Sequence, residues 1–115
     1  MKTLWLDDIR DPVKYGVPDA VWVKDADQFL NALLMLVLDE KMNELEEVHF
    51  DNDLGEGSEG YSMFVYLEEA LHKGSFKNLK RIYVHSSNPS AVHKFMLASR
   101  ALKYHFDIDL IRRPL

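Results

Sequence analysis

The sequence predicts an α/β domain built on a mainly parallel sheet of five strands. Three observations support this prediction. Short apolar runs of strand length recur along the chain, amphipathic helical patterns lie between most of them, and Asp, Ser or Arg residues follow several of the runs. Since parallel strands are joined by right-handed crossovers, few topologies remain, and we expect the strand order 2-1-3-4-5.

The predicted strands are apolar runs rich in Val, Ile, Trp and Tyr. They are, in chain order, Thr3–Leu6, Ala20–Val23, Val48–Phe50, Arg81–Val84 and Ile108–Ile111. The segment between the first two, Ile9–Asp19, contains two prolines and a glycine. We therefore expect it to form a loop or one broken turn instead of a full helix.

The predicted helices have apolar residues at helical spacing. They are Ala26–Met42, Gly60–His72 and Pro89–Lys103. Asp25 can cap the first helix, with Gln28 three residues later in a capping-box arrangement. Gly74 is a plausible stop for the second helix, and Pro89 suits the first turn of the third.

The composition indicates one globular domain over residues 1–115, with 47% hydrophobic and 29% charged residues. The chain contains no cysteine, which excludes a disulfide framework and a thiolate metal site and fits a reducing compartment. A net charge of −5 argues against nucleic acid as a partner. No apolar run approaches the roughly 20 residues of a membrane span, and the first residues do not form a signal peptide. We therefore expect a cytoplasmic protein that binds no membrane.

Polar side chains at the ends of the predicted strands form the candidate site. They are Asp7 and Asp8 after the first strand, Asp51 and Asp53 after the third, Ser86 after the fourth and Arg113 after the fifth. The carboxyl ends of parallel strands meet at one edge of a sheet, so these residues are expected to gather there. Clustered carboxylates need a counter-charge, and magnesium (Mg²⁺) prefers oxygen ligands. An aspartate beside such an ion can attack a phosphoryl group, while a hydroxyl and a cation stabilise its oxygens.

The same residues also have structural interpretations. Two aspartates after a strand can cap a helix or form a solvated turn. Arg10 can bind a phosphate or neutralise the nearby acids, and we favour neutralisation. His85 lies at the edge of the site, where a hydrogen-bonded structural role is the more common one for a lone histidine.

Three motifs occur together in this chain: LDDIRDP at residues 6–12, FDNDLG at residues 50–55 and HSSNP at residues 85–89. With them, Lys2 to Leu115 resembles the receiver domain of bacterial response regulators, and is most similar to small stand-alone receiver-like proteins of phages and bacteria. The resemblance implies a three-layer, flavodoxin-like fold. We expect this chain to differ from a receiver in two elements, with the first helix reduced to the segment Ile9–Asp19 and the fifth helix missing.

The resemblance also implies roles for the site residues. Asp7, Asp8, Asp51 and the backbone carbonyl of Asp53 would hold Mg²⁺. Asp51 would accept a phosphoryl group and Ser86 would sense it. Arg113 takes the place of the lysine that receivers carry after the last strand.

Three functions follow as hypotheses. The first is a stand-alone receiver-like regulator that binds Mg²⁺, is phosphorylated on Asp51 and acts through a protein partner. The second is a pseudo-receiver that only binds, for example a phage protein acting on a host protein. The third is a small metal-dependent phosphohydrolase. An aromatic sheet face with Trp5, Trp22 and Tyr83 is a candidate surface for a partner or a second copy.

Overall fold

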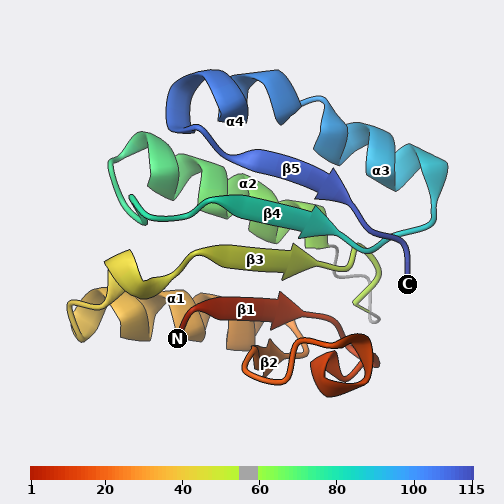
Figure 1. Ribbon diagram of the computed structural model, residues 1–115, viewed down its shortest axis with the longest axis horizontal. Coiled ribbons are helices and arrows are strands. Elements are labelled where there is room, and N and C mark those ends of the chain that lie inside the picture. Colours follow the sequence, from red (N-terminus) through yellow and green to blue (C-terminus); the bar gives the residue numbers. More distant parts are fainter. Residues whose placement is uncertain (55–59) are drawn as a thin grey trace.

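The computed structural model describes residues 1–54 and 60–115, and within them a sheet of five parallel strands has the predicted order (Figure 1). The strands are β1 (Thr3–Leu6), β2 (Val21–Val23), β3 (Glu47–Phe50), β4 (Arg81–Val84) and β5 (Asp109–Arg112), in the spatial order β2-β1-β3-β4-β5. Each agrees with its predicted run to within one residue at either end. Gly55, the last residue of the FDNDLG motif, lies outside the described residues.

The helices follow the predicted pattern with two differences. They are α1 (Ala26–Leu38), α2 (Gly60–His72), α3 (Pro89–Met96) and α4 (Ser99–Phe106), with 3₁₀ turns η1 (Pro12–Tyr15) and η2 (Met42–Glu44). Helix α1 ends four residues before the predicted Met42, because Glu40 adopts a left-handed conformation with φ 58°. The single helix predicted over Pro89–Lys103 is wrong. It divides at Leu97 and Ala98, where the N–H of Ala98 bonds to Phe95 in a tighter i→i+3 turn.

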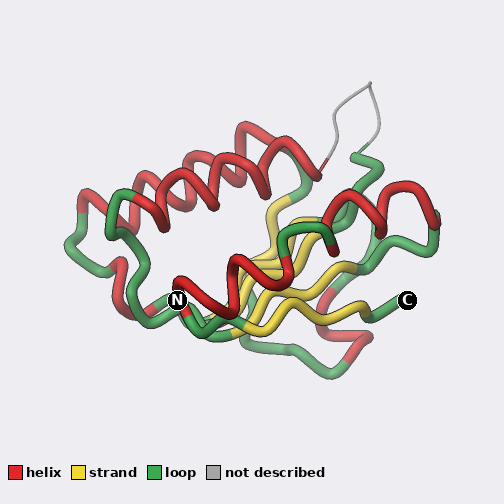
Figure 2. Tube along the Cα trace, turned by 90° about the horizontal axis from the view of Figure 1, so that it is seen from above, coloured by secondary structure: helices red, strands yellow, loops and turns green. Residues whose placement is uncertain are grey.

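The α-helices lie on one face of the sheet, and η1 with its flanking loop lies on the other (Figure 2). The predicted reduction of the first helix is confirmed, since Ile9–Asp19 contains only the short η1. Residues 113–115, after β5, form no helix.

The main core fills the space between the sheet and the helices. Alternate strand residues point into it, and the central one is Phe50, which is fully buried between Phe29, Phe64 and Phe95. Complete burial of such side chains supplies most of the free energy that holds helices to a sheet, at about 1.5–3 kcal/mol each. The strand ends that carry the candidate site are thereby held in fixed register.

The opposite face of the sheet is covered by aromatic and imidazole rings. Trp5 is fully buried and stacks with His49 at 4.7 Å and with Tyr15 of η1 at 6.0 Å. His49 in turn stacks on Tyr83 at 4.3 Å. Trp5 is thus enclosed within its own chain, whereas Trp22 and Tyr83 are partly exposed.

Candidate functional site

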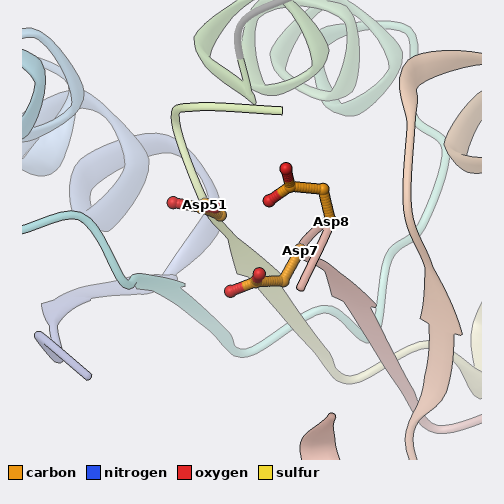
Figure 3. Close-up of side chains that lie close together, drawn as sticks. All are labelled: Asp7, Asp8 and Asp51. Carbon is orange, nitrogen blue, oxygen red and sulfur yellow. The ribbon is translucent and has the colours of Figure 1, made fainter. Parts of the chain in front are cut away.

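The register of β1 and β3 determines where the acidic residues meet. Leu6 pairs with Phe50, and the N–H of Asp51 donates to the carbonyl of Leu6 at 2.8 Å. Asp7 and Asp51 are therefore the first residues beyond two adjacent strands. One carboxylate oxygen from each of Asp7, Asp8 and Asp51 lies within 4.8 Å of the other two (Figure 3). The structure thus brings together three of the four predicted metal ligands through their carboxylates.

Asp7 is fully buried and contacted from several sides. Its Oδ1 accepts hydrogen bonds from the N–H groups of Ile9 at 3.1 Å and Arg10 at 2.9 Å. Its Oδ2 lies 3.4 Å from Nη1 of Arg10 and 3.8 Å from Nδ1 of His85. Burial opposes its ionisation, but the contact with His85, the two N–H donors and the charge of Arg10 outweigh burial and lower the pKa of Asp7. Asp7 is therefore a fixed negative charge.

Asp51 lies in the opposite electrostatic situation. Its side chain is also buried, and burial together with the charge of Asp7 raises its pKa to about 7, although Arg10 acts in the other direction. The ionised form of Asp51 is thus short of positive charge. A divalent cation at this position would supply it.

The start of α2 packs directly against Asp51. The N–H of Gly60 donates to the carbonyl of Asn52 at 2.8 Å, and a Cβ at Gly60 would lie 1.7 Å from the carbonyl oxygen of Asp51. Only glycine permits this approach. The N-terminus of α2, with its partial positive charge, is thereby placed beside the acidic residues.

A cavity of about 310 Å³ opens over the carboxylates. It is lined by Asp8, Ile9, Arg10, Asp51, Asn52, Asp53, Ser86, Ser87 and Asn88. The Oγ of Ser86 accepts a hydrogen bond from the N–H of Asn88 at 3.1 Å, so its own hydrogen is available for donation to a ligand. Asp53 is exposed on the cavity wall, and its carboxylate is not one of the group of three. The cavity therefore combines acidic groups with hydroxyl and amide donors.

The two arginines expected near the site are directed differently. Arg113 does not line the cavity, and its Nη2 donates to the carbonyl of Tyr15 at 2.9 Å, which ties the C-terminal segment to η1. Arg10 lies at the carboxylates, 3.4 Å from Asp7 and 3.9 Å from Asp51. The neutralising role favoured for Arg10 agrees with these contacts. The signal in the sequence is its position two residues after the acidic pair Asp7-Asp8.

A buried pair of histidines adjoins Asp7. Nδ1 of His49 and Nε2 of His85 are 2.8 Å apart, and both residues are 1% exposed. Burial lowers the pKa of both, that of His49 to about 3, so the rings are neutral and share one N–H between them. The two histidines are 36 residues apart in the chain, so their spacing in the sequence does not predict the pair.

The acidic group at the carboxyl ends of β1 and β3, in a sheet of order 2-1-3-4-5, defines a receiver-like domain. Comparison with protein families agrees. A family model described as the cyclic-phosphate processing receiver domain matches residues 2–101, and this chain belongs to that family. Comparison with curated proteins and with solved structures gives no significant match.

Within residues 1–54 and 60–115, no helix has the length and apolar character needed to cross a bilayer.

Proposed function

We propose that this chain binds a divalent cation, Mg²⁺ in the first place, at Asp7, Asp8 and Asp51 and opens a cyclic phosphate ester with Asp51 as nucleophile. The observation that carries the proposal is the gathering of three carboxylates within 4.8 Å, one of them with its pKa raised to about 7. The substrate class is taken from the description of the family, cyclic-phosphate processing.

The residues present fit a hard cation. The three donors that lie close together are carboxylate oxygens, the ligand type that Mg²⁺ prefers. Three carboxylates face one guanidinium, that of Arg10, so the ionised cluster has an excess of negative charge. When bound, the cation would neutralise phosphoryl oxygens and draw them toward Asp51. The ionised form of Asp51 would be favoured at the same time, because an adjacent positive charge lowers a carboxyl pKa.

The proposed reaction has two displacements at phosphorus. In the first, an oxygen of Asp51 bonds to phosphorus while one ring P–O bond breaks, and the released oxygen takes a proton from solvent. In the second, water bonds to phosphorus, the Asp51 carboxylate leaves, and a proton is released. The net change is the addition of one water to the cyclic diester, which gives an open phosphomonoester.

The walls of the cavity suit this substrate. The hydroxyl of Ser86 can donate to a phosphoryl oxygen. Asn52 and Ser87 add amide and hydroxyl groups to the same wall. A volume of about 310 Å³ lies at the small end of the range for ligand pockets, which fits a small ester better than a polymer.

A second function shares the first chemical step. In a phosphorylated receiver, Asp51 accepts a phosphoryl group from a small donor and keeps it, and a protein partner reads the change. The placement of Asp51 and Ser86 on one cavity favours this candidate. Trp22 and Tyr83, partly exposed on the sheet face that carries η1, are the residues through which such a partner or a second copy would bind.

Phosphorus NMR tests the proposal. The protein is incubated with Mg²⁺ and 2′,3′-cyclic or 3′,5′-cyclic nucleotides, or with a simple 1,2-diol cyclic phosphate. We expect conversion of the cyclic signal to a monoester signal in the wild type and in Arg113→Gln, and none in Asp51→Asn. Parallel intact-mass analysis with acetyl phosphate detects the alternative as a lasting gain of one phosphoryl group. If the wild type opens none of these esters while Mg²⁺ is bound, the hydrolase is refuted.

A further inference from the structure

The positive charge of Arg10 lies against two of the carboxylates that would hold a metal ion. Its Nη1 is 3.4 Å from Oδ2 of Asp7 and 3.9 Å from Oδ2 of Asp51. Asp7 and Asp51 belong to the group of three close carboxylates. Among the described residues that line the cavity, Arg10 is the one with a positive charge. It is therefore the resident counter-ion of the acidic cluster.

The main chain of Arg10 is anchored independently of its side chain. Its N–H donates to Oδ1 of Asp7 at 2.9 Å, and its carbonyl accepts from Nε1 of Trp5 at 2.8 Å. The guanidinium contacts are longer than the 2.7–2.9 Å of a tight charge-assisted hydrogen bond, and the side chain is 29% exposed. The side chain can thus change partners while its backbone stays in place.

We propose that Arg10 exchanges partners during binding: it neutralises Asp7 and Asp51 in the metal-free protein, and on cation binding it turns to the phosphate of the substrate. This inference rests on the proposed function and adds an order of binding, in which the cation binds before the phosphate.

Charge counting supports the exchange. Asp7, Asp8 and Asp51, when ionised, carry −3 and Arg10 carries +1, so the metal-free cluster carries −2 and repels a phosphate. A divalent cation brings the charge of the cluster to zero and competes with the guanidinium for the same carboxylates, since two cations beside one carboxylate pair repel each other. The planar fork of the released guanidinium matches phosphate oxygens. Arg113, bonded to the carbonyl of Tyr15, is already engaged elsewhere.

The exchange predicts opposite effects of one substitution. In Arg10→Gln, the competing charge is gone, so Mn²⁺ should bind about tenfold more tightly than to the wild type. Inorganic phosphate, titrated in saturating Mn²⁺, should bind about tenfold more weakly, because its cationic partner is lost. A residue with only a structural role would weaken both ligands together.

Calorimetric titration with Mn²⁺, and then with phosphate, measures both affinities. Arg10→Lys keeps the charge without the fork, so its Mn²⁺ affinity should stay near that of the wild type while its phosphate affinity falls. Arg113→Gln is the matched control and should change neither. Circular dichroism confirms that each variant is folded, and Arg10→Lys continues the test if Arg10→Gln is not.

The outcomes separate the two ideas. If the wild type binds Mn²⁺ but Arg10→Gln does not bind it more tightly, or loses no phosphate affinity, the exchange is refuted and the metal site stands. If the wild type binds phosphate equally well without Mn²⁺, the proposed order is refuted. If the wild type binds neither Mn²⁺ nor Mg²⁺, the proposed function fails and the exchange fails with it.

Discussion

Replacing Asp51 by asparagine should stabilise the metal-free protein, and more so at alkaline than at acid pH. The folded protein raises the pKa of Asp51 from 3.8 to about 7, first through burial and then through the charge of Asp7. Because the folded pKa lies above the unfolded one, the protonated acid contributes stability that is complete below about pH 4 and is lost as the pH rises through about 7. Asparagine has the same shape and no charge to lose.

The magnitude follows from the shift. A change from 3.8 to about 7 corresponds to about 4 kcal/mol, at about 1.4 kcal/mol for each pKa unit. We therefore expect Asp51→Asn to exceed the wild type in free energy of unfolding by about 4 kcal/mol at about pH 8, and by about 2 kcal/mol at about pH 5. The side chain is buried, so solvent screening reduces this figure little.

The difference between the two proteins is more informative than either pH profile alone. Burial lowers the pKa of His49 to about 3. His49 therefore takes up a proton more readily in the unfolded chain, and the free energy of unfolding falls as the pH drops below about 6.5. That loss opposes the effect of Asp51 in the wild type, but it is common to both proteins and cancels in the difference.

Urea unfolding in EDTA, followed by circular dichroism at the two pH values, is the assay. The predicted destabilisation by the ionised Asp51 is refuted if Asp51→Asn is no more stable than the wild type at the higher pH, or if the difference in stability does not shrink at the lower pH. Saturating Mg²⁺ should then raise the stability of the wild type and raise that of the variant much less, because ligand binding to the folded state alone stabilises it.

Three further substitutions test the supports of the site. Gly60→Ala places a Cβ 1.7 Å from the carbonyl oxygen of Asp51, and such an overlap with backbone should lower the free energy of unfolding by several kcal/mol. An unfolding experiment that gives wild-type stability would contradict this close approach. Arg113→Gln removes the 2.9 Å hydrogen bond to the carbonyl of Tyr15 and should lower the free energy of unfolding in urea by about 1 kcal/mol. Its Mn²⁺ affinity should stay within about twofold of the wild type, and a large loss of affinity would instead assign Arg113 to the site. Asn88→Ala removes the side-chain acceptor for the first N–H groups of α3, which should lower the free energy of unfolding by about 1 kcal/mol and speed amide hydrogen exchange in that turn. Unchanged exchange would show that the cap contributes nothing.

The parts of the fold that depend on local pattern were predictable. The apolar run before Asp7 and the one before Asp51 mark two strands, and parallel topology then places both acids at one edge. The division of the predicted third helix was not predictable in this way. Phe95 and Leu102 are seven residues apart and share one buried face whether the helix is continuous or bent at Leu97.

The contacts of several polar and charged side chains were also not predictable from the sequence. Arg113 donates to the carbonyl of Tyr15, which precedes it by 98 residues, so the residues near Arg113 in the sequence do not indicate this contact. The link between His49 and His85 likewise depends on the register of β3 with β4. Arg10 is close to Asp7 in the sequence, so one turn of the chain is enough to bring the two together. For this residue the sequence therefore predicted two possible roles, neutralisation of the nearby acids or binding of a phosphate.

The two tryptophans have a consequence for experiments on this protein. Nε1 of Trp5 donates to the carbonyl of Arg10, and Nε1 of Trp22 donates to the carbonyl of Asp7. The chain has two tryptophans in all, so both of its indole fluorophores are bonded to the turn that carries the acidic pair. Any displacement of that turn changes an indole hydrogen bond, and with it the emission spectrum. Intrinsic fluorescence therefore reports on events at the carboxylates without an attached dye.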